Sequence, residues 1–287
     1  MVSGYWMNRC EPKLDASVAP ERTSMKQQDH SLSPAHGALL ETIPLPAGAQ
    51  IDAVDVDYEL DGTGLQGYVA FDAASTESRP GVLIIHDWLG LQEYPKVRAQ
   101  MLARLGYVAF AADIYGTGVR PSPQDGAKVS GAFYGDPALV RARATAGLAQ
   151  LRANPLVDPG RIAVIGYCFG GFVALELARS GADVAGVVPF HGVLSTPATD
   201  GAANIRAKIL VLAGGSDPVV PDEQIVEFFS EMRAAPQVDW QLVSYSGAQH
   251  AFTLPEANSP EHGAAYHPVA ERRSWAAMLA FFDEIFA

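Results

Sequence analysis

Cys168 has the residue type and the surroundings that a catalytic nucleophile requires. It follows the apolar run RIAVI closely and directly precedes the helical pattern FGGFVALELARS, with Gly166 and Gly170 two positions to either side. A cysteine at a sharp turn from a strand into a helix has the form of a nucleophile elbow with sulfur in place of serine oxygen. Free N–H groups at the start of the helix favour the thiolate. The competing interpretation is a buried structural cysteine beside glycines that permit tight packing.

Asp217 and His250 follow Cys168 in the order nucleophile, acid, histidine. Asp217 comes after the predicted strand AKILVLAGG, and His250 comes after the predicted strand WQLVSYSG. We expect His250 to take the thiol proton, and Asp217 to fix the imidazole tautomer and stabilise the imidazolium. The alternatives are a turn-forming aspartate and a surface histidine, one of 7 in the chain. Three residues in this order favour the catalytic interpretation.

The loop after the strand GVLII predicts a second part of such a site. It contains Asp87 and Trp88, at the place where related folds supply one oxyanion-hole N–H group. We predict that the backbone N–H groups of Trp88 and Phe169 stabilise the negative charge of a tetrahedral intermediate. Apolar side chains at Trp88, Phe252 and Leu254 are the candidate walls of a pocket for a small, partly hydrophobic substrate.

The elements around these residues predict an α/β fold. Residues 51–60 and 64–72 alternate apolar and polar positions around the turn Asp61-Gly62, which indicates two antiparallel strands. From residue 81 onward, short apolar runs alternate with helical patterns, which is typical of a doubly wound, mostly parallel sheet with helices on both faces. In such a sheet ligands bind beyond the carboxyl ends of the strands, where Cys168, Asp217 and His250 stand.

Two segments fall outside this alternation. Residues 1–35 show neither helical nor strand periodicity, so we predict an irregular N-terminal extension before a single domain over residues 36–287. Residues 116–136 are rich in Gly, Pro and Ser, which predicts a functional loop or a lid. Arg120 and Lys128 in that loop are interpreted as solvated charges rather than as an anion site.

Composition excludes several classes of protein. The chain has 32 acidic and 20 basic residues, a net charge of −12 without a basic cluster, which excludes nucleic acid as a partner. Two cysteines cannot form a disulfide framework, and no apolar run approaches the roughly 18 residues of a membrane span, so we expect a cytoplasmic protein with no membrane partner. His86, His191 and His250 stand on separate predicted loops without an H-E-x-x-H motif, so we expect no metal and no cofactor.

The stretches LIIHDWLGL, YVAFAADIYG, RIAVIGYCFGG, GVVPFHG, LAGGSDPVVP and HAFTLPEAN resemble the dienelactone hydrolase family of α/β-hydrolases. The resemblance runs from about residue 40 to the C-terminus and implies that Cys168, Asp217 and His250 form the triad. It also implies that Asp87, one methylene shorter than the usual Glu, contacts the resting thiol. His191 matches a variant of the family pattern and is interpreted as a hydrogen-bonded structural residue. Leu254 replaces an arginine that binds the substrate carboxylate in the best-known members.

Together these residues predict a cofactor-independent hydrolase of small carboxylic esters or lactones. Cys168 would form a thioester acyl-enzyme that water then hydrolyses. Two alternatives stay open at this point. One is a thioesterase, and the other is a non-hydrolytic protein of the same fold that binds ligands or senses oxidants through its thiol.

Overall fold

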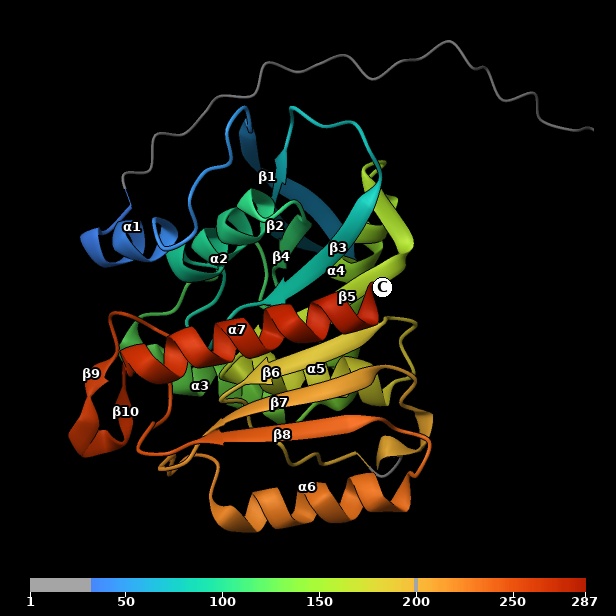
Figure 1. Cartoon of the computed structure of the whole chain (residues 1–287). Coiled ribbons are helices and arrows are strands. Elements are labelled where there is room, and N and C mark those ends of the chain that lie inside the picture. Colours follow the sequence, from blue (N-terminus) through green and yellow to red (C-terminus); the bar gives the residue numbers. More distant parts are fainter. Residues whose placement is uncertain (1–31, 199–200) are drawn as a thin grey trace, which may run out of the picture. The chain divides into compact units, whose positions relative to one another are not determined.

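The computed structural model describes residues 32–198 and 201–287 of the chain (Figure 1). The predicted irregular extension therefore lies, up to residue 31, outside the described residues. Its last positions belong to helix α1, which spans Pro34–Leu40 and begins after Ser33, whose side chain accepts a hydrogen bond from the His36 amide. Leu39 and Leu40 of this helix are buried in the core.

The strands of the main sheet are β1 (Ile51–Leu60), β2 (Thr63–Asp72), β3 (Arg79–Ile85), β4 (Val108–Ala112), β5 (Val157–Tyr167), β6 (Gly186–Phe190), β7 (Lys208–Gly214) and β8 (Trp240–Tyr245). The further α-helices are α2 (Glu93–Arg104), α3 (Pro123–Tyr134), α4 (Pro137–Ala153), α5 (Phe169–Arg179), α6 (Asp222–Ala234) and α7 (Pro268–Ile285). Short elements are the 3-10 helices Gly201–Asn204 and Pro260–His262 and the strands β9 (Asn258–Ser259) and β10 (Ala264–Ala265). Within the described residues, no helix combines the length and apolarity needed to cross a bilayer.

The main sheet has the order β1-β2-β4-β3-β5-β6-β7-β8. β1 pairs antiparallel with β2 and β2 with β4, whereas all later neighbours are parallel. The predicted hairpin turn is confirmed, since Asp61 (φ 49°) and Gly62 (φ 75°) both have the positive φ of the turn that suits two twisted strands. The α/β-hydrolase fold predicted from the sequence is therefore confirmed, with β5 near the centre of the sheet.

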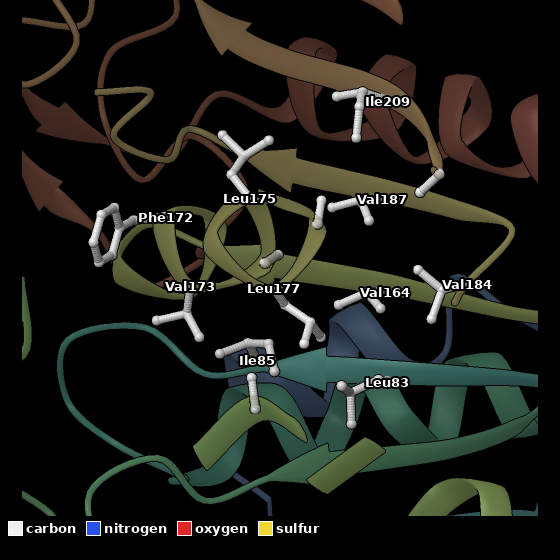
Figure 2. Close-up of a cluster of buried hydrophobic side chains, with 14 of the residues drawn as sticks. Leu83, Ile85, Val164, Phe172, Val173, Leu175, Leu177, Val184, Val187 and Ile209 are labelled. Atoms are coloured by element: carbon white, nitrogen blue, oxygen red, sulfur yellow. The ribbon is translucent and has the colours of Figure 1, made fainter. Parts of the chain in front are cut away.

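Two hydrophobic layers cover the sheet because successive strand residues point to opposite faces. Along β3, Val82 and Ile84 join the layer under α2 and α7, while Leu83 and Ile85 join the layer under α4, α5 and α6. Figure 2 shows the second layer, where side chains of α5 pack against those of β3, β5 and β6. Burial on both faces explains the continuous apolar runs of the parallel strands.

Two segments before α4 differ from what their sequence suggests. The stretch YVAFAADIYG forms strand β4 only as far as Ala112, because the segment from Asp113 to Gly116 turns around the Asp113 carboxylate, which accepts the Tyr115 and Gly116 amides. The predicted loop over residues 116–136 contains the 12-residue helix α3. Ser122 followed by Pro123 is a helix start, and Gly126 lets the helix approach the Trp88 ring, so the glycine taken as a loop signal serves close packing.

Candidate active site

Cys168 occupies a strained turn between β5 and α5. Its backbone has φ 54° and ψ −115°, a left-handed conformation that non-glycine residues seldom adopt. The two flanking glycines are there because of close backbone approaches. A β-carbon at Gly166 would overlap the Gly170 carbonyl, and one at Gly170 would overlap the Ile85 carbonyl of β3. The elbow therefore holds Cys168 at the carboxyl end of the sheet, with its side chain partly exposed.

The structure brings Cys168, His250 and Asp217 into one hydrogen-bonded series. His250 Nε2 lies 3.0 Å from Cys168 Sγ, and His250 Nδ1 lies 2.9 Å from Asp217 Oδ2. The other carboxylate oxygen of Asp217 accepts the amides of Val219 (2.8 Å) and Val220 (3.3 Å). Both Asp217 oxygens are thus occupied, and the buried carboxylate is fixed in the direction that orients the imidazole.

A short hairpin holds the loop that carries His250. The His250 amide donates to Gly263 O (2.9 Å), and the Ala265 amide donates to His250 O (3.0 Å), which joins the loop to β10. Gly263 (φ 76°) packs directly on Pro218, the residue after Asp217. The β9–β10 segment therefore supports the acid loop and the histidine loop together. The sequence analysis missed this hairpin because each of its strands has only 2 residues.

The charges of its two neighbours raise the pKa of His250. Burial by itself lowers the pKa of this imidazole, but the Cys168 sulfur and the Asp217 carboxylate outweigh burial and raise the pKa to about 10. A protonated imidazole donates its Nε2–H to the sulfur, and this is the partner that a thiolate requires. The geometry can therefore hold a thiolate-imidazolium pair ready for nucleophilic attack.

The Trp88 and Phe169 amides lie on the two loops that meet at the elbow. Phe169 is the first residue of α5, and the α5 start abuts the end of β3, from which the Trp88 loop leaves. Neither amide donates a hydrogen bond to any described residue, whereas the next loop amide, of Leu89, donates to Asp87 Oδ1 (2.8 Å). Unpaired N–H groups are what an oxyanion hole needs, and these two amides stay a prediction for that role.

The structure does not join Asp87 to the thiol. Among the described residues Asp87 has no hydrogen bond to Cys168, and its carboxylate instead accepts the Leu89 amide. The Asp87 side chain is buried, and loss of solvent raises its pKa to about 6, although the Leu89 amide and His250 oppose that rise. The implied contact with the resting thiol therefore remains a prediction, and Asp87 is a buried carboxyl whose pKa is raised above its usual value.

The residues predicted to line a pocket separate into two groups. Trp88 and Leu254 are half-buried, and the Trp88 ring packs on Gly126 of α3. Phe252 is instead a core residue, because its ring is fully buried between Tyr245 and His191. This corrects its assignment as a pocket wall. An alternating pattern could not separate these cases, since all three are apolar residues in loops.

Arg120 and His86 are held by contacts within the fold, and Lys128 faces solvent. Arg120 is bound within its own loop, because its Nη1 lies 3.5 Å from Asp113 Oδ1 and donates to the carbonyls of Gly116 and Val119, whereas Lys128 is exposed. His86 is fully buried and accepts the Ile114 amide (3.1 Å). Over residues 32–198 and 201–287, no group of three or more His, Cys, Asp and Glu side chains is placed to hold a metal ion.

Three aromatic side chains around Phe169 and a second buried histidine were not predicted as parts of the site. The aromatic wall consists of Tyr115, Phe133, Tyr134 and Phe169. Its rings pack around Phe169 with centroids 5.3 Å (Tyr115), 6.2 Å (Phe133) and 5.3 Å (Tyr134) away. The spacing of Phe133 and Tyr134 in a helical segment was the available signal, and the loop interpretation hid it. His191 lies beside His250, with a distance of 5.3 Å between the two ring centroids.

Comparisons with known proteins give one family match and several similar chains. Residues 65–286 match the model of the dienelactone hydrolase family. "Protein usf" of Aquifex pyrophilus is 28% identical over 235 residues, which cover 80% of this chain and 97% of the relative. A Bradyrhizobium protein named "Probable 2-oxo-3-(5-oxofuran-2-ylidene)propanoate lactonase" is 29% identical over 231 residues, 77% of this chain and 89% of the relative. A crystal structure of a dienelactone hydrolase-like promiscuous phosphotriesterase from metagenomic libraries superimposes with a TM-score of 0.79 at 40% identity and covers 83% of this chain and 99% of that one.

Proposed function

Because the chain belongs to the dienelactone hydrolase family, we propose that it hydrolyses small carboxylic esters and lactones with Cys168, His250 and Asp217 as its catalytic triad. The observation that carries the proposal is the series of contacts from sulfur to imidazole (3.0 Å) to carboxylate (2.9 Å) at an accessible elbow. Those distances lie within the reach of a nucleophile and its general base. The reaction needs no cofactor, since each step uses a group of this chain or water.

The proposed reaction begins when Cys168 Sγ attacks the acyl carbon. The carbonyl oxygen becomes an oxyanion that accepts the free Trp88 and Phe169 amides. His250 Nε2 then gives its proton to the leaving alkoxide as the C–O bond breaks, which leaves a thioester on Cys168. In a lactone, the alkoxide remains attached as the hydroxyl of the opened acyl chain.

The second half of the reaction releases the acid. His250 removes a proton from a water molecule, and the hydroxide attacks the thioester carbon. The C–S bond breaks, the acid departs, and the sulfur with the His250 proton returns to the starting pair. The Asp217 side chain keeps its contact with His250 Nδ1 and stabilises the imidazolium. Esters are favoured over amides because alkoxides are better leaving groups than amide nitrogen.

Turnover of 4-nitrophenyl acetate and a simple lactone by the full chain tests the proposal. Cys168→Ala and His250→Ala should abolish sustained turnover, while Cys10→Ala, at the other cysteine, should not change it. Mass spectrometry of the quenched wild-type reaction should find the acetyl group on the Cys168 peptide. A single acetylation without further turnover would contradict the hydrolase and support the thiol-sensor alternative. A thioester that is hydrolysed at least about 100 times faster than its matched oxygen ester would support a thioesterase.

Phosphotriesters are a second candidate class of substrate. The observation that favours them is the structural relative whose title names a promiscuous phosphotriesterase, at 40% identity over 99% of its length. In that reaction the same sulfur attacks phosphorus and expels an aryloxide while the two amides bind the phosphoryl oxygen, and water that gives its proton to His250 then attacks phosphorus and breaks the S–P bond. Diethyl 4-nitrophenyl phosphate would test this candidate, and turnover that depends on both Cys168 and His250 would support it.

A further inference from the structure

The Cys168 amide has an acceptor that the proposed mechanism does not use. Its N–H lies 3.0 Å from Phe190 O and 3.1 Å from His191 Nδ1, so a side chain from the end of β6 binds the backbone of the elbow. To accept this N–H, His191 Nδ1 must carry no proton. The other ring nitrogen therefore carries the proton of the neutral imidazole.

That proton points to the loop of the proposed base. His191 Nε2 lies 2.7 Å from Thr253 Oγ1, and Thr253 stands three residues after His250 in the loop. Between them Ala251 has φ 56°, a strained conformation that external contacts must hold in place. One imidazole thus connects the elbow of Cys168 to the loop of His250.

Helices α2 and α7 hold the far end of this connection. Tyr94 Oη lies 2.9 Å from Thr253 Oγ1, and Arg98 donates to Tyr94 Oη (3.1 Å) and to Thr253 O (3.2 Å). Arg98 also forms a buried ion pair with Glu271 of α7 at 3.0 Å. Inside a core, each group in such a series of hydrogen bonds has a fixed orientation, because each buried polar group needs its partner.

The surroundings keep the His191 ring neutral beside a charged partner. Burial and then the nearby His250 hold the pKa of His191 well below its usual value, and Arg98 acts in the same direction. The titratable and charged groups that face the ring are Cys168, His250, Tyr167 and Arg98. A protonated His191 would lose its acceptor for the Cys168 amide and would place a second cation next to the imidazolium of His250.

We propose that His191 and Thr253 are positioning residues that couple the Cys168 elbow to the His250 loop and so set the contact between sulfur and imidazole. The inference deepens the proposed hydrolase and rests on it for its kinetic consequence. His191 fixes the nucleophile through the backbone, and Thr253 fixes the ring that does so. Neither side chain touches the reacting atoms.

The decisive variant is Thr253→Val, which keeps the shape of the side chain and removes its hydroxyl. Without that acceptor the His191 ring can exchange its tautomer and present Nδ1–H to the Cys168 N–H. We expect kcat for 4-nitrophenyl acetate to fall at least about tenfold with little change in KM, because a small misplacement of reacting groups is costly. Thr253→Ser keeps a hydroxyl and should stay within about threefold of wild type.

Alkylation of Cys168 supplies a readout that does not depend on catalysis. The rate of reaction with iodoacetamide, mapped to the Cys168 peptide across pH, reports the formation of the thiolate. We expect Thr253→Val to move the midpoint upward by at least about half a pH unit, because a displaced His250 stabilises the thiolate less. The matched control is Tyr245→Phe, which removes a buried hydroxyl that has no partner in the described structure and lies in the same core beside Phe252.

The outcomes separate the two proposals. A folded Thr253→Val protein with wild-type kcat and alkylation profile would overturn the coupling, and so would a Thr253→Ser protein that falls as far as Thr253→Val. If Thr253→Val does not fold, Tyr94→Phe removes the hydroxyl that joins Thr253 to Arg98, and it must shift the alkylation midpoint while Tyr245→Phe does not. If the wild-type protein hydrolyses no ester, the proposed function fails, while the alkylation profiles still decide the inference.

Discussion

The two sides of the Cys168 elbow are built in different ways. On the side of β6, β7 and β8, hydrogen bonds surround the elbow. They join Cys168 to His250, His250 to Asp217, and the Cys168 amide to His191. Toward β3, β4 and α3 it meets the aromatic wall, whose rings pack at centroid distances of 5.0 to 6.2 Å. Hydrogen bonds fix atoms to within fractions of an ångström, whereas ring packing shapes a space. We therefore expect the polar side to set the rate and the two half-buried members of the aromatic wall, Phe133 and Tyr134, to set the fit of the substrate.

The largest effect should come from Asp217→Asn on the polar side. The Asn oxygen can still accept the Val219 and Val220 amides, so the loop should keep its shape. The amide nitrogen would face His250 Nδ1 and stabilise the tautomer with the proton on Nε2, which cannot take a proton from the thiol. We expect kcat to fall by roughly 10³ to 10⁴-fold, measured with 4-nitrophenyl acetate.

The matched control is Asp222→Asn, at an exposed aspartate at the start of α6. It should leave kcat unchanged, and both variants should retain the circular dichroism of the wild type. A near-normal rate for Asp217→Asn would mean that another carboxylate orients His250. It would contradict the expectation that the polar side sets the rate through Asp217.

The second effect concerns the stability of the elbow itself. Gly166→Ala places a methyl group against the Gly170 carbonyl, and the rigid backbone on both sides cannot yield. We expect the free energy of unfolding in urea to drop by about 3 kcal/mol or more. Gly131→Ala in α3 meets open space and should raise the same free energy by up to about 1 kcal/mol. Equal effects of the two changes would contradict the strained elbow.

These contrasts also mark what the sequence could predict. Cys168, Asp217 and His250 were predictable because chain order and the carboxyl ends of parallel strands place them at one sheet edge. The role of Gly166 and Gly170 followed from the same turn, and the sheet followed from continuous apolar runs. The contact from His191 to Thr253 was not predictable, because it depends on the direction of two side chains in separate loops. Helix α3 was missed because Gly126 and Gly131 resemble loop residues when their packing is unknown.

The third effect is a pH dependence on the aromatic side, through Asp87. Its folded-state pKa of about 6 lies above the ordinary value of 3.8, so the folded protein binds this proton more strongly than the unfolded chain does. The contribution to stability is present below about pH 4 and is lost as the pH rises through about 6. Asp87→Asn should therefore gain stability relative to wild type over this window, by about 3 kcal/mol at most.

Urea unfolding of both proteins at a series of pH values measures this difference. For activity, we expect a step in kcat/KM of the wild type near pH 6 that is absent from Asp87→Asn. A constant stability difference between pH 4 and pH 7 would mean that Asp87 is solvated more than its burial indicates.

The smallest effect should come from Tyr134→Phe in the aromatic wall. Within the described residues the Tyr134 hydroxyl makes no hydrogen bond, while the ring packs on Phe169 at 5.3 Å and on Phe172 at 4.8 Å. Phenylalanine keeps both ring contacts, so we expect kcat/KM for a neutral ester to stay within about threefold and the unfolding free energy within about 0.5 kcal/mol.

Tyr115→Phe makes the matched comparison, because it removes a hydrogen bond of 3.2 Å to the Trp88 carbonyl. Its effect should be larger, since Trp88 also carries one of the proposed oxyanion donors. A loss above about tenfold for Tyr134→Phe would show that its hydroxyl binds the reacting group, and the aromatic wall would then take part in the chemistry as well as in the fit.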